Sequence, residues 1–258
     1  MISSGDDEHL AAGIAREAGD LLVSLRRSGL SGRELGDRGD ADANSLIIGQ
    51  ISTRRPGDSI LSEESPDDQR RLQANRVWIV DPLDGTREYS TPGCTDWAVH
   101  IAVWCRGVGL SASAVALPAS GRVYTSATAQ RRAPERRSED GDPLLIAVSA
   151  SRPQPEAEAV AEVTGCRLVR IGSAGAKVMA VLNGEVDAYI HTGGQWEWDS
   201  AAPVGVALAA GLHASRIDGS ELVYNQSHPY VPDLLVCRCD VAGILLDALG
   251  AQRLGKSE

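Results

Sequence analysis

The sequence lacks the cysteine patterns that build zinc sites and disulfide frameworks. Its five cysteines are odd in number, and none has the paired Cys-x-x-Cys and His spacing of a zinc site. They stand in apolar or mixed surroundings, which favours reduced and mostly buried thiols. The five are Cys94, Cys105, Cys166, Cys237 and Cys239.

Long apolar runs are also missing. The run around Val204 to Leu212 is among the longest, and it stops well short of the roughly 20 residues that a bilayer crossing needs. The N-terminus is acidic and lacks the basic start and continuous apolar stretch of a secretory signal. We therefore expect no membrane span, and we place the protein in the cytoplasm.

Basic residues are outnumbered, with 25 Lys and Arg against 35 Asp and Glu and a formal net charge of −10. A nucleic-acid polymer requires a basic stripe, and the arginine pairs of this chain are scattered, so such a partner is excluded. An acidic protein can still bind a small phosphorylated metabolite where divalent cations bridge the negative charges. The charge balance therefore points to a metal site.

Apolar periodicity predicts an α/β protein in two parts. In the first part we expect helices over residues 10–27 and 44–51, and strands over 59–62, 77–80, 97–104, 111–117 and 122–126. In the second part strands over 144–149 and 167–171 alternate with helices over 155–163, 174–183 and 204–212. A polar segment with two prolines, residues 129–143, separates the parts. We therefore place an α+β domain at residues 1–140 and an α/β domain at residues 141–258.

The strongest local signal is the string Asp-Pro-Leu-Asp-Gly-Thr at residues 81–86. It puts Asp81 and Asp84 three residues apart at the exit of a buried strand, so that both carboxylates can reach one small volume. Gly85 permits a tight turn, and Thr86 can begin a helix, where free N–H groups attract anions. The alternative is an ordinary Asp/Gly turn with Asp84 as a helix cap.

Two further acidic positions complete a candidate metal site. Glu63 follows the strand over 59–62, and Asp199 precedes an apolar, Ala-rich helix for which it is an obvious N-cap. Each is by itself typical of a solvated turn or a helix cap. Together with Asp81 and Asp84 they supply the hard oxygen ligands that suit Mg²⁺.

Three strings, in this order and spacing, resemble the inositol monophosphatase superfamily of Mg²⁺-dependent, lithium-sensitive phosphatases. They are LSEES at 61–65, WIVDPLDGTREY at 78–89 and WEWDSAAP at 196–203. The forms LSEE and DPLDGTRE are most similar to the CysQ branch, the 3′(2′),5′-bisphosphate nucleotidases. The resemblance covers nearly the whole chain, and it implies a layered αβαβα sandwich with an α+β N-terminal half and an α/β C-terminal half.

The resemblance also implies roles for individual residues. Two or three Mg²⁺ ions would be held by a set of side chains and one backbone carbonyl, namely Glu63, Asp81, Asp84, Asp199 and the carbonyl of Leu83. Thr86 and an upstream Asp would orient and deprotonate the attacking water. Family members show Thr-x-Ala-Asp at the upstream position, whereas this chain has Asp37, Asp40 and Asp42. We favour Asp40, with Asp42 as the alternative.

A loop at residues 172–177 resembles the family segment that contacts the substrate beyond its phosphate. The expected substrate contacts are Gly85, Thr86, Gly172, Ser173, Ala174 and Lys177, and the turn at residues 149–152 is a further candidate for a second phosphate. Without the resemblance, this loop is equally well a strand-to-helix turn that requires small residues. We interpret His100 and Trp198 as packing residues.

The leading hypothesis is therefore hydrolysis of the 3′-phosphate of 3′-phosphoadenosine 5′-phosphate, with 3′-phosphoadenylyl sulfate as a related substrate. The alternatives within the enzyme class are inositol monophosphate and fructose 1,6-bisphosphate. A non-enzyme alternative is an inactive nucleotide- or metal-binding module, against which the intact acidic set argues. Relatives commonly form homodimers, but the sequence marks no interface.

Overall fold

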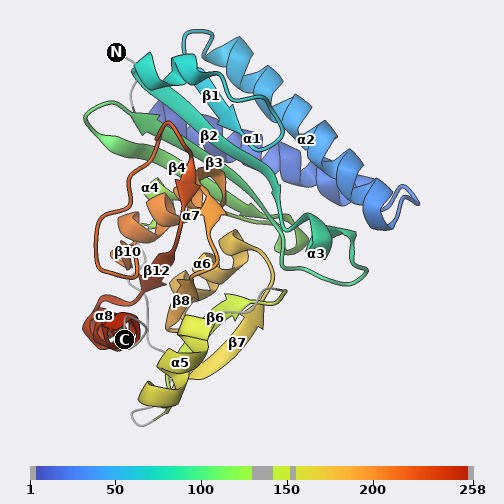
Figure 1. Cartoon of the computed structure of the whole chain (residues 1–258). Helices are drawn as coiled ribbons and strands as arrows, with labels where there is room; N and C mark the ends of the chain where they lie inside the picture. Colours follow the sequence, from blue (N-terminus) through green and yellow to red (C-terminus); the bar gives the residue numbers. More distant parts are fainter. Residues whose placement is uncertain (1–3, 130–141, 152–154, 255–258) are drawn as a thin grey trace.

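The computed structural model describes residues 4–129, 142–151 and 155–254, and its helices and strands form stacked layers (Figure 1). The first sheet has the strand order β1-β2-β3-β4-β5, in which β1 and β2 are parallel and the other neighbours antiparallel. Its strands are β1 (Ser59–Ser62), β2 (Arg76–Asp84), β3 (Ala98–Cys105), β4 (Gly109–Leu117) and β5 (Arg122–Thr125). Short helices connect them, namely η1 (Gln69–Gln73), α3 (Thr86–Ser90), η2 (Pro118–Ser120) and α4 (Ser126–Ala129).

The second sheet has the order β10-β12-β8-β6-β7, with β7, β6 and β8 parallel. Its strands are β6 (Leu145–Ser149), β7 (Arg167–Ile171), β8 (Ala188–His191), β10 (His213–Ser215) and β12 (Leu234–Cys237). A small antiparallel ribbon pairs β9 (Gln195–Trp196) with β11 (Tyr230–Val231). Because β8 leads directly into this ribbon, the ribbon lies near the carboxyl end of the second sheet.

Helices cover the faces of both sheets. The long helices α1 (Ser4–Leu25) and α2 (Gly32–Arg54) bury their apolar faces on the outer side of the first sheet. The helices α6 (Ala174–Leu182) and α7 (Glu197–Ala209) lie between the sheets, and α5 (Pro155–Thr164) and α8 (Cys239–Leu254) cover the outer face of the second. The order of layers is α/β/α/β/α, as the family resemblance implies.

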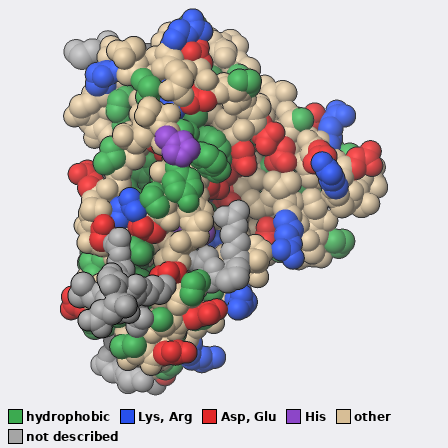
Figure 2. All heavy atoms as spheres, viewed as in Figure 1, with side chains coloured by type: hydrophobic (Ala, Val, Ile, Leu, Met, Phe, Trp, Pro, Cys, Tyr) green, Lys and Arg blue, Asp and Glu red, His purple; other side chains and the backbone are tan. Residues whose placement is uncertain are grey.

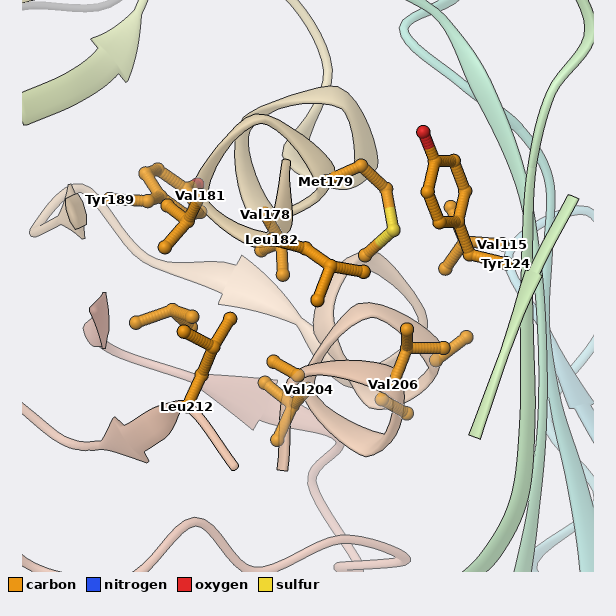
Figure 3. Close-up of a cluster of buried hydrophobic side chains, with 14 of the residues drawn as sticks. Val115, Tyr124, Val178, Met179, Val181, Leu182, Tyr189, Val204, Val206 and Leu212 are labelled. Atoms are coloured by element: carbon orange, nitrogen blue, oxygen red, sulfur yellow. The ribbon is translucent and has the colours of Figure 1, made fainter. Parts of the chain in front are cut away.

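The central layer holds the core that joins the two sheets. Figure 3 shows Val178 and Met179 of α6 and Val204 of α7 between Tyr124 of the first sheet and Tyr189 of the second. The alternation of strand side chains makes this possible, since each sheet presents one apolar face to the middle and another to its outer helices. The two sheets are therefore fixed relative to each other by a continuous apolar contact.

Helix α2 begins at Gly32, twelve residues before the start that the sequence predicts. The Asp-rich segment 36–45 is helical because its small residues continue the buried face toward the N-terminus, and exposed i,i+4 ion pairs link Arg33 to Asp37 and Arg38 to Asp42. The buried positions are Leu35, Gly36, Gly39, Ala43, Ile47 and Ile51. The predicted helix start at residue 44 is wrong, because a buried face built from glycine and alanine carries little hydrophobic periodicity.

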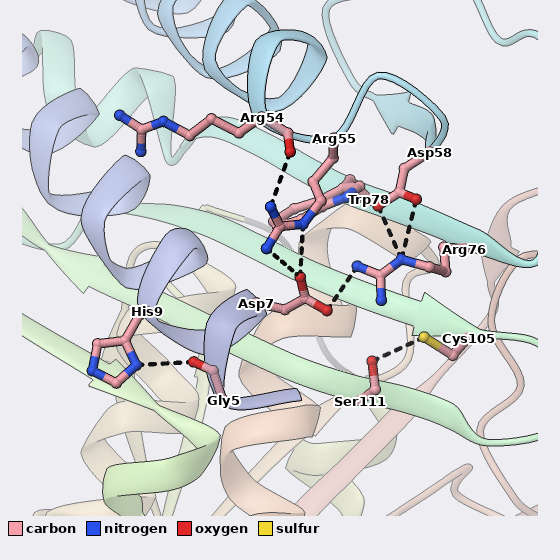
Figure 4. Close-up of polar contacts among 10 residues, drawn as sticks. All are labelled: Gly5, Asp7, His9, Arg54, Arg55, Asp58, Arg76, Trp78, Cys105 and Ser111. Carbon is pink, nitrogen blue, oxygen red and sulfur yellow. Dashed lines mark hydrogen bonds and ion pairs between the residues drawn. The ribbon is translucent and has the colours of Figure 1, made fainter. Parts of the chain in front are cut away.

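A polar cluster fastens α1 and α2 to the first sheet (Figure 4). The carboxylate of Asp7 is 1% exposed and pairs with Arg55 at 3.0 Å and with Arg76 at 2.7 Å. Arg76 also pairs with Asp58, which accepts a hydrogen bond from the indole N–H of Trp78 at 2.8 Å. The buried charge of Asp7 is thus matched by two guanidinium groups.

The predicted domain boundary near residue 140 lies outside the described residues, so the division into 1–140 and 141–258 stays a prediction. All five cysteines are free; Cys166 and Cys237 are buried and Cys239 is exposed. Across the described ranges, we find no helix that combines the length and apolar character of a bilayer crossing. On the face that Figure 2 shows, Lys and Arg side chains alternate with Asp and Glu and form no continuous basic stripe over the described residues.

Candidate active site

A bulge in β2 brings the two aspartates of the Asp-Pro-Leu-Asp string together. Asp81 lies opposite His100 and Asp84 lies opposite Ala98, so three steps along β2 match two along β3. In a regular strand, residues three apart point to opposite faces, and the extra residue of the bulge reverses this. Pro82 stands in the bulge, where its missing N–H costs no ladder bond. The carboxylates of Asp81 and Asp84 therefore approach one point.

Asp199 comes to the same point from α7. Ligand oxygens of Asp81, Asp84 and Asp199 all lie within 4.8 Å of one another. The N-cap residue of α7 is Trp196, so the expectation that Asp199 is itself the N-cap is wrong. Asp199 stands three residues later, and its Oδ2 accepts a hydrogen bond from the backbone N–H of Trp196 at 2.6 Å. Asp199 therefore accepts a hydrogen bond from the N-cap residue from the third position of the helix, as the acidic residue of a capping box does.

The geometry of these carboxylates suits a cation. Asp81 is 1% exposed, and among the residues that the structure describes its buried Oδ2 has no hydrogen-bond partner. Burial and the nearby charges of Glu63, Asp84 and Asp199 raise the pKa of Asp81 well above its usual range. An ionised carboxylate in such a place requires a compensating positive charge. Hard carboxylate oxygens clustered in this way are the ligands that Mg²⁺ prefers.

Asp84 is held by groups on two elements, β3 and α6. Its Oδ2 accepts a hydrogen bond from the backbone N–H of Gly175 at 2.7 Å and lies 3.2 Å from Nε2 of His100. Burial opposes ionisation, but His100 and Lys177 outweigh it and lower the pKa of Asp84. Because Oδ2 makes both contacts, Oδ1 is available to a cation. His100 is fully buried and also contacts the carbonyl of Trp198 at 3.2 Å through Nδ1, so it packs as expected and positions an acidic residue as well.

Glu63 reaches the cluster from the neighbouring strand. Because β1 and β2 are parallel, with Ser62 beside Val80, both chains leave the sheet at the same edge. The side chain of Glu63 stands at the rim of the cavity, outside the tight group of three aspartates. Loss of water around the carboxyl and repulsion by Asp199 raise the pKa of Glu63 to about 8.

The hydroxyl of Thr86 lies 3.3 Å from Oδ1 of Asp40 and 3.3 Å from the carbonyl oxygen of Leu83. Gly85 precedes it with φ 89°, a left-handed conformation that glycine adopts readily. Burial and the charge of Glu64 raise the pKa of Asp40 to about 7. The structure thus brings Asp40 to Thr86, and their catalytic role stays a prediction.

The alternative residue, Asp42, lies elsewhere on α2. Its carboxylate pairs with Arg38 at 2.6 Å, one helical turn earlier. An exposed pair of this kind is typical of a helix surface and requires no functional explanation. Of the two candidates that the sequence leaves open, only Asp40 contacts Thr86.

The loop at residues 172–174 is tied to the first half of the chain. The N–H of Gly172 donates to Oδ2 of Asp96 at 3.3 Å, and the N–H of Ser173 donates to the carbonyl of Asp96 at 3.1 Å. The ammonium of Lys177 donates to the carbonyls of Gly172 and Ser173 at 2.5 and 2.8 Å. Burial lowers the pKa of Lys177 to about 8, against the opposing effect of Asp84. Lys177 therefore stabilises the loop in addition to lining the cavity.

A cavity of about 340 Å³ unites these groups, within the range of small-molecule sites. It is lined by every site residue that the sequence predicts except Asp40, which lies behind Thr86. The other lining residues are Arg87, Glu88, Ser149, Ser151, Tyr189, His191 and Gln195. No motif marks Tyr189, His191 or Gln195 in the sequence, because they come from a short strand and a ribbon whose position only the fold decides. Arg152, in the turn at residues 149–152 that the sequence marks as a candidate for a second phosphate, lies outside the described residues.

A buried network holds the first turn of α7. The carboxylate of Glu197 accepts hydrogen bonds from the N–H groups of Asn225 at 2.6 Å and Gln226 at 2.8 Å. Arg71, which is completely buried, donates to the side chain of Asn225 and to both carboxylate oxygens of Asp67. Glu197 stands two residues before Asp199, so the network fixes the backbone that carries a carboxylate of the site.

The five layers and the carboxylate cavity between the two sheets define an α/β protein that can hold a cation and a phosphate together. The chain belongs to the inositol monophosphatase family, which its residues 11–240 match. The superfamily that the motifs indicate and the layered fold are both confirmed.

Individual relatives agree with this assignment. The chain is 55% identical over 256 residues to the 3′-phosphoadenosine 5′-phosphate phosphatase of Mycobacterium leprae, with 94% of this chain and 93% of that protein covered. It is 33% identical to the inositol-1-monophosphatase SuhB of Mycobacterium tuberculosis, over 76% of this chain and 75% of that protein. The crystal structure of CysQ from Bacteroides thetaiotaomicron shares the fold with a TM-score of 0.77 and 24% identity, over 90% of this chain and 97% of that one.

Proposed function

We propose that this chain is a Mg²⁺-dependent phosphomonoesterase that removes the 3′-phosphate of 3′-phosphoadenosine 5′-phosphate. The observation that supports the chemistry is the meeting of Asp81, Asp84 and Asp199 within 4.8 Å, where the buried Oδ2 of Asp81 has no hydrogen-bond partner among the described residues. The observation that supports the substrate is 55% identity, over almost the whole of both chains, to a protein of that name.

The metal ligands in this proposal are the side chains of Glu63, Asp81, Asp84 and Asp199 and the carbonyl of Leu83, holding two or three Mg²⁺ ions. Bound Mg²⁺ supplies positive charge for the phosphoryl oxygens and lowers the pKa of water. The bulge in β2 sets the approach of Asp81 and Asp84, and the capping contact of Asp199 with Trp196 fixes the third carboxylate.

Thr86 and Asp40 handle the proton of the attacking water. Thr86 accepts a hydrogen bond from the water and passes its own hydroxyl proton toward Asp40, 3.3 Å away. A carboxyl with a pKa of about 7 is well matched to accept a proton near neutral pH. Gly85 and the loop residues Gly172, Ser173 and Ala174 contact the substrate, with Lys177 holding this loop.

Several finer points belong to the proposal. The protein works in the cytoplasm, where free thiols such as its five cysteines persist. The sulfated relative, 3′-phosphoadenylyl sulfate, is a second substrate of the same site. A homodimer, as the family resemblance implies, is part of the same proposal.

A second candidate substrate is inositol 1-phosphate, which is favoured by the 33% identity to an inositol-1-monophosphatase. The test is phosphate release from adenosine bisphosphate, inositol 1-phosphate and fructose 1,6-bisphosphate with Mg²⁺. We expect kcat/KM for the adenosine bisphosphate to exceed the others by more than tenfold. A tenfold preference for either of the others overturns the substrate, and release from none of the three establishes the inactive-module alternative.

A further inference from the structure

The side chain of Asn44, on α2, holds the backbone on both sides of Glu63. Its carbonyl oxygen Oδ1 accepts a hydrogen bond from the hydroxyl of Ser62 at 2.8 Å, immediately before Glu63. Its Nδ2 donates to the hydroxyl of Ser65 at 3.1 Å and, over 3.4 Å, to the carbonyl of Glu64, both of which follow Glu63. One amide therefore spans the short segment that carries a proposed metal ligand.

Glu63 differs from the three aspartates of the site in how its carboxylate is held. Each aspartate carboxylate accepts a hydrogen bond from a backbone N–H, that of Leu83 for Asp81 at 3.0 Å and those of Gly175 and Trp196 for the other two. Within the described residues, no hydrogen bond or ion pair reaches the carboxylate of Glu63. The direction of its side chain therefore depends on how firmly its backbone is held.

The backbone bonds of this segment are long. Strand β1 ends at Ser62, and beyond it the N–H of Glu63 donates to the carbonyl of Val80 at 3.3 Å. The N–H of Ser65 donates to the carbonyl of Ser62 at 3.4 Å, which closes a turn. Both distances exceed the usual range for N–H donors. The bond from the Ser62 hydroxyl to Asn44 is shorter, and Ser62 is only 3% exposed, so the amide is a firm restraint on the segment.

These contacts explain why an asparagine stands inside α2. Asparagine is a poor helix former at interior positions, because its side chain competes for backbone hydrogen bonds. Here the amide of Asn44 bonds across to the segment after β1, while Ile47, one turn later, is fully buried and fixes α2 against the first sheet. Asp40 precedes Asn44 by one turn, so the same face of α2 reaches both Thr86 and the Glu63 segment.

We propose that Asn44 is a positioning residue that holds the carboxylate of Glu63 at the rim of the cavity, in the place where it binds Mg²⁺. This inference rests on the proposed function, in which Glu63 is a metal ligand. Asn44 does not line the cavity, so it acts through Glu63 and not by direct contact. A glutamate on a loose backbone loses conformational entropy when it binds a cation, and a backbone that is already fixed reduces this loss.

The test is a double-mutant cycle on Mg²⁺ affinity, measured by calorimetric titration of Mg²⁺ into the full chain after removal of metal with EDTA. Asn44→Ala is compared in the wild type and in the Glu63→Gln background, and Ser62→Ala removes one of the contacts from the other side. Ser45→Ala is the matched control, because its exposed hydroxyl bonds within α2 to the carbonyl of Ala41 at 2.8 Å. Near-UV circular dichroism checks that each variant is folded. Phosphate release from adenosine 3′,5′-bisphosphate is followed at increasing Mg²⁺ concentration.

We expect Asn44→Ala to raise the Kd for Mg²⁺ about threefold to tenfold and Ser62→Ala about threefold, the range for one or two lost hydrogen bonds. In the Glu63→Gln background, Asn44→Ala should alter Kd by less than about twofold, because the ligand that Asn44 positions is then gone. The Mg²⁺ concentration for half-maximal activity should rise with Kd, whereas kcat at saturating Mg²⁺ should stay within about threefold of the wild type. Ser45→Ala should change neither quantity.

A loss of the same size in the Glu63→Gln background would overturn the inference, since Asn44 would then act on the fold in general. Unchanged Mg²⁺ affinity in Asn44→Ala or in Glu63→Gln would overturn it as well, and so would a loss in Ser45→Ala equal to that in Asn44→Ala. Wild-type protein that shows the full cycle but releases no phosphate from any of the three substrates would contradict the proposed function and leave the role of Asn44 in place.

Discussion

The hydroxyl of Thr86 lies 3.3 Å from Oδ1 of Asp40, although 46 positions separate them in the chain. The contact joins the first turn of α3 to the middle of α2 beside the carboxylate cavity. Of the neighbouring aspartates Asp37, Asp40 and Asp42, it is Asp40 that makes this contact. Substitution of Asp40 is therefore the first test of the proposed reaction.

Replacing Asp40 by Asn should remove the proton acceptor and lower kcat about a hundredfold or more, the usual range for general base catalysis. At saturating Mg²⁺, kcat/KM of the wild type should fall tenfold per unit as the pH decreases below the pKa of Asp40, because only the ionised carboxylate accepts a proton. This dependence should be lost in the variant. Asp42→Asn is the control and should stay within about twofold, since it breaks only an exposed ion pair. Equal losses in both variants would contradict the assignment.

The metal-free protein should lose stability as the pH rises. The folded pKa values of Glu63 and Asp40 are raised to about 8 and about 7, above the usual carboxyl range, so the folded state binds more protons than the unfolded state at intermediate pH. Stability present below the unfolded pKa values is therefore lost as the pH rises through the folded ones. We expect Tm in EDTA to decrease between about pH 5 and about pH 8, by linkage.

Mg²⁺ should reverse this loss, with a larger increase in Tm at the higher pH, because it binds the ionised folded state. Asp81→Asn provides the control: with one buried carboxylate removed, Tm in EDTA at high pH should rise and the response to Mg²⁺ should largely disappear. A Tm in EDTA that increases steadily over the whole range would show that the carboxylates do not repel one another.

Gly175→Ala should disturb the site although alanine favours a helix. A Cβ on Gly175 would lie 2.2 Å from Nε2 of His100, which is itself 3.2 Å from Asp84. We expect a loss of at least tenfold in kcat/KM and weaker Mg²⁺ binding by calorimetry. Gly13→Ala on α1, where no atom lies within 4 Å of the added carbon, should instead stabilise the protein by about 0.5–1 kcal/mol. Wild-type kinetics in Gly175→Ala would show that His100 does not position Asp84.

Glu197→Ala should weaken both the fold and the metal site. The change leaves the buried N–H group of Asn225 and the N–H group of Gln226 without their acceptor, at a cost of about 2–4 kcal/mol in the free energy of unfolding by urea. Because Asp199 stands on the same helical turn, the Kd for Mg²⁺ should also rise. Glu221→Ala, at an exposed position, should change neither quantity. A destabilised variant with unchanged Mg²⁺ affinity would show that the buried network around Glu197 does not support the metal site.

The motif strings carry much of this site in the sequence itself. The string at 81–86 and the residues Glu63 and Asp199 mark the carboxylates, because cation ligands require particular side-chain types at fixed spacings. Apolar periodicity predicts the strands of the first sheet, β6 and β7, and the helices α1, α5, α6 and α7, but it predicts neither the strands β8 to β12 nor the helix α8. Helix α2 begins earlier than predicted, because the buried residues Gly36, Gly39 and Ala43 of its first half are small and give no apolar signal.

The sequence by itself determined the acidic side chains that gather at the cavity and, through its motifs, the family, and the layered fold was expected because the family resemblance implies it. Only the tertiary structure decided that Asp40 rather than Asp42 contacts Thr86, that a bulge turns Asp84 toward Asp81, and that Gln195 is among the residues that line the cavity. The physical reason is that local spacing encodes which residues share a strand or a helix face. Contacts between elements depend on register, bulges and helix starts, which many weak interactions fix together.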